Sequence, residues 1–232
     1  MSSVSSEGSP VGRRVVLGMV GLGALGVATG AWVQRGVNRA LGPVGSGISG
    51  IVPAAGGFRF YTVTGPVKRI APADYNLRVR GLVERPRSYS FADLQHALPQ
   101  TRMTDTFHCV TGWNVPNVAW EGVALPDLLD AVGVRPGARG VRFTSFDGTY
   151  TESLTMEQAR RRDVIVATGM LGGPVSHDHG GPVRMYVAPM YGYKSTKWLS
   201  GIEVVGDVRP GYWEERGYDV DAWVGRSNGY TS

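Results

Sequence analysis

From residue 58 onward, the sequence contains short stretches in which apolar or β-branched residues recur at nearly every second position. Most are bounded by Gly, Pro or Asp, as strands usually are. The predicted strands are 58–63, 77–83, 141–146, 164–170, 183–189 and 198–205. Helical patterning with a cap or a proline near the start occurs at 90–98, 124–132 and 155–162. Strands outnumber helices without regular alternation, so the predicted class is α+β and β-rich.

The N-terminal part of the chain has a different pattern. Arg13 and Arg14 precede an apolar, Gly-rich run over 15–33. No Asp or Glu occurs from Val11 to Ala73. This layout predicts a twin-arginine export signal over residues 1–35 and an extracytoplasmic location. Its 19 apolar-rich residues just span a bilayer core of about 30 Å. Cleavage and retention as a membrane anchor therefore both stay open.

Residues 36–57 are rich in Gly, Ser and Pro and are predicted to be a linker, so the folded domain is expected over 58–232. The stretch from Gly21 to Gly26 matches the dinucleotide fingerprint G-x-G-x-x-G. That fingerprint needs an acidic residue about 20 positions later to bind the ribose. No acid follows until Asp74, which argues against a nucleotide site.

Charge adds one constraint on partners. The net charge is +5 and the isoelectric point about 9.5. The basic residues are dispersed, without a Lys/Arg run or zinc-finger spacing, so nucleic acid is not the expected partner.

Cys109 is the single cysteine of the chain and stands in "DTFHCVTGWNVPNVAW", where a strand is expected to run into a loop with a turn at 114–117. It has three interpretations: a buried core residue, a nucleophile with His177 or His179 as base, or a metal ligand. An unpaired thiol in an exported protein is open to oxidation, whereas a bound metal protects it. Zinc is disfavoured, because no C-x-x-C occurs and the adjacent His108 cannot easily share one tetrahedral ion.

A second cluster lies within 177–198, where His179, Arg184, Lys194 and Lys197 accompany Gly-rich backbone. Fixed cations beside exposed backbone N–H groups are typical of a phosphate site. The alternative is an ordinary solvated loop with surface charge.

Six blocks of the sequence occur together in a specific order. They are "FYTVTG", "LRVRGLVERP", "FHCVTGW", "VAWEGVALPDLL", "HGGPVRMYVAPMYGYKSTKWL" and "RPGYWEERGYDVDAW", spread over 58–230. In this combination the chain resembles the molybdopterin-dependent oxidoreductases of the sulfite-oxidase fold, in particular their small bacterial branch with the periplasmic methionine-sulfoxide reductase catalytic subunit. The resemblance implies a sulfite-oxidase-type molybdopterin-binding domain with a molybdenum–molybdopterin cofactor.

The resemblance also implies roles for individual residues. Cys109 corresponds to the catalytic thiolate that ligates molybdenum. The residues implied to bind the cofactor are Tyr61, Thr62, Cys109, Thr144, His179, Arg184, Ser195, Thr196 and Lys197. Candidates for the substrate mouth are Trp113, Asn114, His108 and Tyr191.

The implied activity is the transfer of an oxygen atom and two electrons between the metal and a sulfoxide-, N-oxide- or sulfite-like substrate. Val110 replaces the acid that methionine-sulfoxide reductases carry beside the cysteine, and His179 is the choice of sulfite oxidases. A haem domain is not expected, so a separate electron-transfer partner, a membrane haem protein in this family, is implied. Two alternatives stay open: a non-catalytic molybdopterin-binding electron relay and a cysteine hydrolase.

Overall fold

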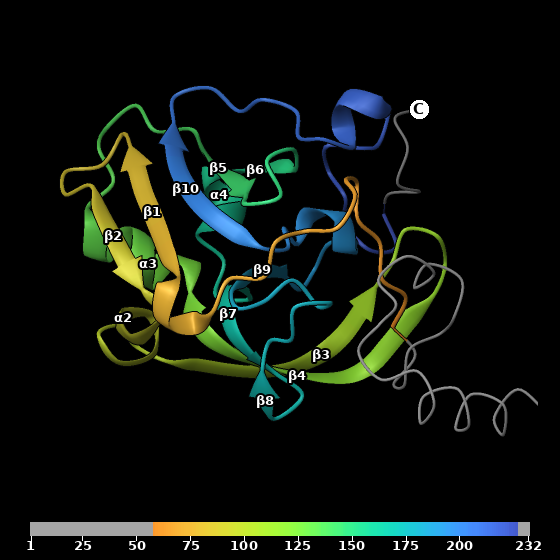
Figure 1. Cartoon of the computed structure of the whole chain (residues 1–232). Helices are drawn as coiled ribbons and strands as arrows, with labels where there is room; N and C mark the ends of the chain where they lie inside the picture. Colours follow the sequence, from red (N-terminus) through yellow and green to blue (C-terminus); the bar gives the residue numbers. More distant parts are fainter. Residues whose placement is uncertain (1–57, 227–232) are drawn as a thin grey trace, which may run out of the picture. The chain divides into compact units, whose positions relative to one another are not determined.

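Two β-sheets form the framework of the part of the chain that the computed structural model describes, residues 58–226 (Figure 1). The export signal and linker predicted for residues 1–57 lie outside the described residues. The first sheet has the order β2-β1-β10-β5-β6, with bounds Arg87–Ser90, Asn76–Gly81, Leu199–Val205, Gly140–Ser145 and Thr151–Thr155. The second has the order β3-β4-β7-β8 with β9 also paired to β7, and its bounds are Thr101–His108, Asn114–Ala124, Val164–Met170, Gly173–Pro174 and Arg184–Val187.

Most strand pairs are antiparallel, and the pairing of β1 with β10 is parallel. In β1 the buried residues alternate with exposed ones, so that Leu77 and Val79 face the core. This alternation follows from the two-residue period of side chains along a strand. The long β3–β4 hairpin curves along one side of the described part (Figure 1).

The helices are short and begin at signals that are visible in the sequence. They are α2 (Phe91–His96), α3 (Leu125–Val132) and α4 (Met156–Ala159), with 3-10 turns η1 (Pro72–Asp74), η2 (Gly192–Lys194) and η3 (Glu214–Arg216). Ser90 and Asp93 form a capping box on α2, and Thr155 and Gln158 form one on α4. Each box satisfies backbone donors that a helix start leaves free. The three predicted helices are confirmed. No helix within 58–226 is both long enough and apolar enough to cross a bilayer.

The core has two parts. The larger draws residues from both sheets and from α3, whose Leu125, Leu128 and Leu129 have 0% exposure. The smaller surrounds Trp120 and Tyr186, whose rings stack with centroids 4.3 Å apart. This second core also contains Phe107, at the end of β3, and Trp113 packs against it, so it adjoins the loop that carries Cys109.

Two sequence expectations are wrong in detail. Residues 58–63 join no strand ladder, because Phe58 instead packs its ring on Phe107 with centroids 5.5 Å apart. The turn expected at 114–117 lies within β4, where the β3–β4 register shifts between Asp105 and Phe107. The chain reverses earlier, over 109–113, where Gly112 has φ +92°. The other five predicted strands correspond to β1, β5, β7, β9 and β10.

Candidate functional site

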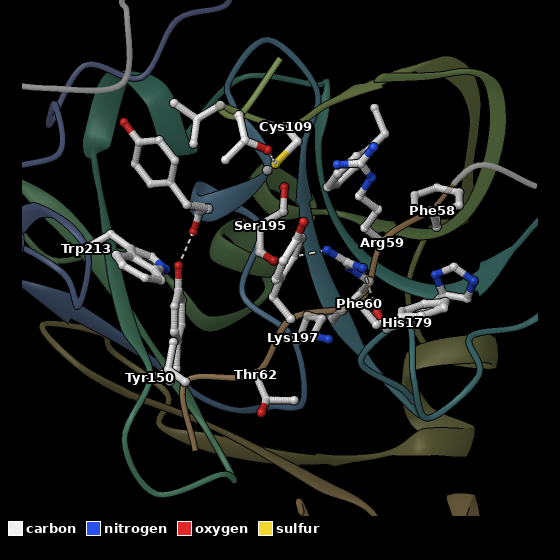
Figure 2. Close-up of a pocket in the computed structure, with 18 of the residues that line it drawn as sticks. Phe58, Arg59, Phe60, Thr62, Cys109, Tyr150, His179, Ser195, Lys197 and Trp213 are labelled. Atoms are coloured by element: carbon white, nitrogen blue, oxygen red, sulfur yellow. Dashed lines mark hydrogen bonds between the residues drawn. The ribbon is translucent and has the colours of Figure 1, made fainter. Parts of the chain in front are cut away.

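A cavity of about 390 Å³ lies where five segments distant in sequence meet (Figure 2). The segments are 58–63, the 109–113 loop, 147–150, 178–198 and 213–218. Its volume is within the range of small-molecule sites, about 300–1,000 Å³. In Figure 2, Tyr150 and Trp213 lie on one side of Cys109, Ser195 and Lys197, while Phe58, Phe60 and His179 lie on the other. Aromatic rings therefore flank the cavity on both sides of the thiol and Lys197.

Cys109 begins the five-residue loop that joins β3 to β4 and lines the cavity. Its N–H donates to the Trp113 carbonyl over 2.9 Å, and its own carbonyl accepts from the Gly112 N–H over 3.1 Å. This tight turn brings the Thr111 hydroxyl within 3.2 Å of the Cys109 Sγ. The thiol is therefore held by its backbone and has a hydroxyl partner.

Arg184 begins β9 with a side chain that is only 3% exposed and faces the cavity. Its guanidinium donates to the carbonyls of His179 over 2.5 Å and Ser195 over 3.1 Å, and Nε donates to that of Met185 over 3.2 Å. Within the described residues it has no carboxylate partner. Burial without a counter-charge lowers its pKa to about 10.

Lys197 is the second cation at the cavity. Its Nζ donates to the Asp178 carbonyl over 3.1 Å and lies 4.2 Å from the centre of the Trp198 ring. Burial, reinforced by the positive charge of Arg184, lowers its pKa to about 7. Gly180, at φ +96°, lets this approach occur, because a Cβ there would lie 2.5 Å from the Lys197 Cβ. Two cations that are stabilised by carbonyls instead of carboxylates are suited to an anionic ligand.

His179 lies between two phenylalanine rings. Its ring centre is 4.7 Å from those of both Phe58 and Phe60, in edge-on geometry. Burial, followed by the charges of Arg184 and Lys197, lowers its pKa to about 4. The imidazole is therefore neutral at pH 7 and able to donate or accept one hydrogen bond.

The structure brings most of the predicted cofactor-binding residues to this cavity. Those that line it are Tyr61, Thr62, Cys109, His179, Arg184, Ser195 and Lys197. Tyr61 is half exposed at the edge, and the Ser195 Oγ accepts from the Val187 N–H over 3.0 Å.

Two predicted cofactor-binding residues do not line the cavity. Thr144 lies on β5, where its Oγ1 is 3.5 Å from the Ser200 Oγ. Thr196 is fully buried, and its hydroxyl has no hydrogen-bond partner within the described residues. The cofactor roles of both stay predictions.

The candidates for the substrate mouth are mostly placed elsewhere. Trp113 lines the cavity, whereas His108 and Asn114 form a cross-strand pair and Tyr191 packs against the larger core. Lys194, expected beside a phosphate, has a fully buried side chain in ion pairs with Glu152 and Glu214. That expectation is wrong because the lysine points away from the cavity into a carboxylate pair.

Sequence reasoning missed an aromatic group that lines the cavity opposite His179. We call it the aromatic wall, and it consists of Tyr150, Tyr193, Trp213 and Tyr218. Two of its members stand in the block "RPGYWEERGYDVDAW", which the resemblance quoted without assigning it a role. Thr111 was missed as well, although its spacing from Cys109 within a turn was a usable signal.

Comparison with known proteins decides the family. The oxidoreductase molybdopterin-binding domain matches residues 64–213, more than half of the chain. The chain belongs to this molybdopterin-binding oxidoreductase family. As a family member, it shares 34% identity over 151 residues with the uncharacterized oxidoreductase YuiH of Bacillus subtilis, covering 64% of this chain and 75% of that one.

Other members of the family are more distant. The sulfite oxidase of Arabidopsis thaliana is 31% identical over 180 residues, covering 63% of this chain and 46% of that protein. The protein-methionine-sulfoxide reductase catalytic subunit MsrP of Ralstonia nicotianae is 29% identical over 158 residues, covering 62% and 47%. The chain thus spans about half the length of these two relatives. The crystal structure of the sulfane dehydrogenase SoxCD from Paracoccus pantotrophus superposes with a TM-score of 0.58 and 25% identity, over 62% of this chain and 41% of that one.

The residues at the cavity fit the cofactor that the family binds. A dithiolene-bound molybdenum takes sulfur ligands, and Cys109 supplies a thiol at the cavity surface. The phosphate of the pterin cofactor needs cationic donors. Arg184 and Lys197 can serve, because neither has a carboxylate partner within the described residues. No group of three His, Cys, Asp or Glu side chains is placed as a metal site within the same residues. One thiol beside two cations matches a metal whose other ligands come with its cofactor.

Proposed function

We propose that this oxidoreductase transfers an oxygen atom and two electrons between a small substrate and molybdenum bound to molybdopterin, with Cys109 as the protein ligand. The observation that carries the proposal is the joint placement in one cavity of the only thiol and of two cations that contact carbonyls, the buried Arg184 and the half-buried Lys197. When bound, the cofactor supplies the two-electron and oxygen-atom chemistry.

The residues of this chain are proposed to bind the cofactor and to orient it and the substrate. Arg184 offers a planar guanidinium that Ser195 and His179 hold in place through their carbonyls, and Lys197 adds a point charge beside it. The neutral His179 is expected to contact the pterin ring system between Phe58 and Phe60. The aromatic wall excludes water from the opposite side and is assigned to the substrate.

The substrate class is proposed from the same chemistry. In the reducing direction, a sulfoxide or N-oxide takes up two electrons and two protons and yields a sulfide or amine and water. In the oxidising direction, a sulfite-like anion and water yield a sulfate-like anion, two protons and two electrons. The electrons are exchanged with a separate electron-transfer protein, for which the family resemblance supports a membrane haem protein.

Export is part of the proposal. The paired arginines before a Gly-rich apolar run support the twin-arginine route, which carries folded, cofactor-loaded proteins. Membrane contact through residues 15–33 follows if that segment is retained. The mature N-terminus of protein recovered from its native host distinguishes cleavage from retention.

Turnover assays test the activity. Purified protein with its native molybdenum is assayed with reduced benzyl viologen and methionine sulfoxide or trimethylamine N-oxide, and with sulfite and an oxidised dye. Turnover of at least one substrate class is expected. Stoichiometric molybdenum with no turnover of any of them would instead favour the electron relay, and inactivation of a molybdenum-free protein by thiol alkylation would favour a cysteine hydrolase.

A further inference from the structure

A lysine with a fully buried side chain lies between two carboxylates behind the aromatic wall. The Lys194 Nζ is 2.8 Å from the Glu152 Oε1 and also forms an ion pair with Glu214. The exposed fractions of the three side chains are 0%, 0% and 1%. Buried charges are costly to desolvate, and apolar residues of similar volume often serve packing equally well. Packing alone therefore does not explain why three charged side chains are buried here, and the segments that they connect do.

Each charged residue of this cluster stands close in sequence to a member of the aromatic wall. Lys194 ends η2 and directly follows Tyr193. Glu152 lies on β6, two residues after Tyr150. Glu214 begins η3 directly after Trp213. Lys194 also directly precedes the cavity residue Ser195. One ammonium group thus joins residues 195–198, called the cofactor-binding loop after its proposed role, to the two other segments that carry the wall.

The wall is also tied together through its own backbone. The Tyr150 hydroxyl donates to the Tyr193 carbonyl over 2.5 Å, and the Tyr193 hydroxyl donates to the Asp219 carbonyl over 2.6 Å. The rings of Trp213 and Tyr218 lie with centroids 5.0 Å apart. A displacement of η3 would therefore move two wall residues together.

The segment that carries Trp213 has little regular structure of its own. Among described residues after β10, η3 is the single helix or strand. Glu214 accepts from the Gly211 N–H as well as from Lys194, and a Cβ on Gly211 would lie 2.7 Å from the Glu152 Oε1. The carboxylates thus hold this segment closely against β6.

We propose that Lys194, Glu152 and Glu214 form a positioning cluster that fixes the aromatic wall against the cofactor-binding loop and so sets the substrate-binding side of the cavity. The inference rests on the proposed function, because it assigns the wall to the substrate. None of the three residues lines the cavity, so each acts through its neighbours.

The protonation of the cluster supports this role. Burial raises the pKa of Glu152 to about 8, with Lys194 opposing the rise and Glu214 adding to it. Tyr150 and Tyr193, which also face the carboxylates, stay neutral because burial raises their pKa values. At pH 7 the Glu152 carboxyl is therefore mostly protonated, and above pH 8 it adds a buried negative charge.

The test compares Glu214→Gln with the matched control Glu215→Gln, an exposed glutamate one residue later. The first readout is acrylamide quenching of Trp213, isolated by subtracting the Trp213→Phe version of each protein. Glu214→Gln is expected to increase this quenching about twofold at pH 7, whereas Glu215→Gln leaves it unchanged. The parent protein is expected to show the same increase between pH 7 and 9, and Glu214→Gln to lack this pH step.

The second readout is steady-state kinetics with methionine sulfoxide and reduced benzyl viologen. Glu214→Gln is expected to raise KM about fivefold and to change kcat less than twofold, since a loosened wall weakens substrate binding and leaves the metal in place. Equal quenching and equal KM in the two variants would overturn the proposal. If Glu214→Gln does not fold, Glu152→Gln takes its place. Because Glu152 is protonated at pH 7, this variant should keep the parent's quenching at pH 7 and lose the increase between pH 7 and 9, and an unchanged pH step would overturn the proposal.

Failure of the proposed function would look different. A protein that carries molybdenum without turnover contradicts the proposed activity, while the quenching of Trp213 still decides whether the cluster positions the wall. Normal turnover with unchanged quenching leaves the activity standing and overturns the positioning role.

Discussion

The chemistry of the site depends on a few residues whose surroundings alter their ordinary properties. Arg184 and Lys197 are cations without a carboxylate partner in the described part, and Cys109 has Thr111 beside its sulfur. The sequence identified three of these four residues. Thr111 escaped notice because its role depends on the turn that follows β3, and the turn had been expected elsewhere.

Thr111 is expected to tune the metal. Its hydroxyl lies 3.2 Å from the Cys109 Sγ, and a hydrogen bond to a ligating sulfur withdraws electron density from the metal. Thr111→Val should make the two-electron reduction potential of the loaded enzyme more negative by about 20 mV, the equivalent of a hydrogen bond of about 1 kcal/mol. Thr111→Ser serves as the control and should keep the parent potential. A potentiometric titration that finds no difference between Val and Ser would refute the role.

Lys197 should make the stability of the cofactor-free protein depend on pH. Its folded-state pKa of about 7 lies below the ordinary value of 10.5, so between these pH values the unfolded chain binds more protons and stability rises with pH. Lys197→Met removes the buried charge and is expected to raise the free energy of unfolding at pH 6 by about 1 kcal/mol, after allowance for solvent screening. The gain should vanish near pH 10. Urea denaturation checks it, with the exposed Lys68→Met as control; equal effects of the two would contradict the assignment.

The elements show where sequence reasoning succeeds. Helices α2, α3 and α4 were predicted because caps and a proline mark their starts. Strands β2, β4, β6 and β8 were not predicted; β8 is too short for two residues to carry a period. Residues 58–63 have the pattern of a strand, yet their apolar side chains face the cavity and His179. Local alternation reports which faces are apolar, and it does not report what covers them.

Helix α3 contributes fully buried leucines to the larger core. Leu128→Ala removes a side chain from the larger core and leaves a cavity, so we expect a loss of about 2–5 kcal/mol in the free energy of unfolding. Leu171, which is 54% exposed, offers a matched control, and Leu171→Ala should change stability by less than about 0.5 kcal/mol. Equal melting temperatures for the two variants would show that α3 is not part of the core.

At the scale of the whole molecule, the cavity is assembled from segments separated by as much as 160 residues of sequence. No local pattern shows that 58–63, the Cys109 loop and the segment after β10 converge. Seven of the residues that the family resemblance predicted line this cavity. The aromatic wall and the Lys194 cluster become visible only in the packing of η2, β6 and η3. Long-range contacts, and not periodicity, make the site.

The central claim is that molybdenum binds in this cavity through Cys109. Molybdenum X-ray absorption on the protein purified from a molybdenum-competent host and on its Cys109→Ser variant tests it most directly, because sulfur and oxygen neighbours scatter differently. We predict stoichiometric molybdenum in the parent protein and one sulfur neighbour fewer in the variant that retains metal, or loss of the metal altogether. An unchanged number of sulfur neighbours in Cys109→Ser, or an intact parent protein without molybdenum, would contradict the account.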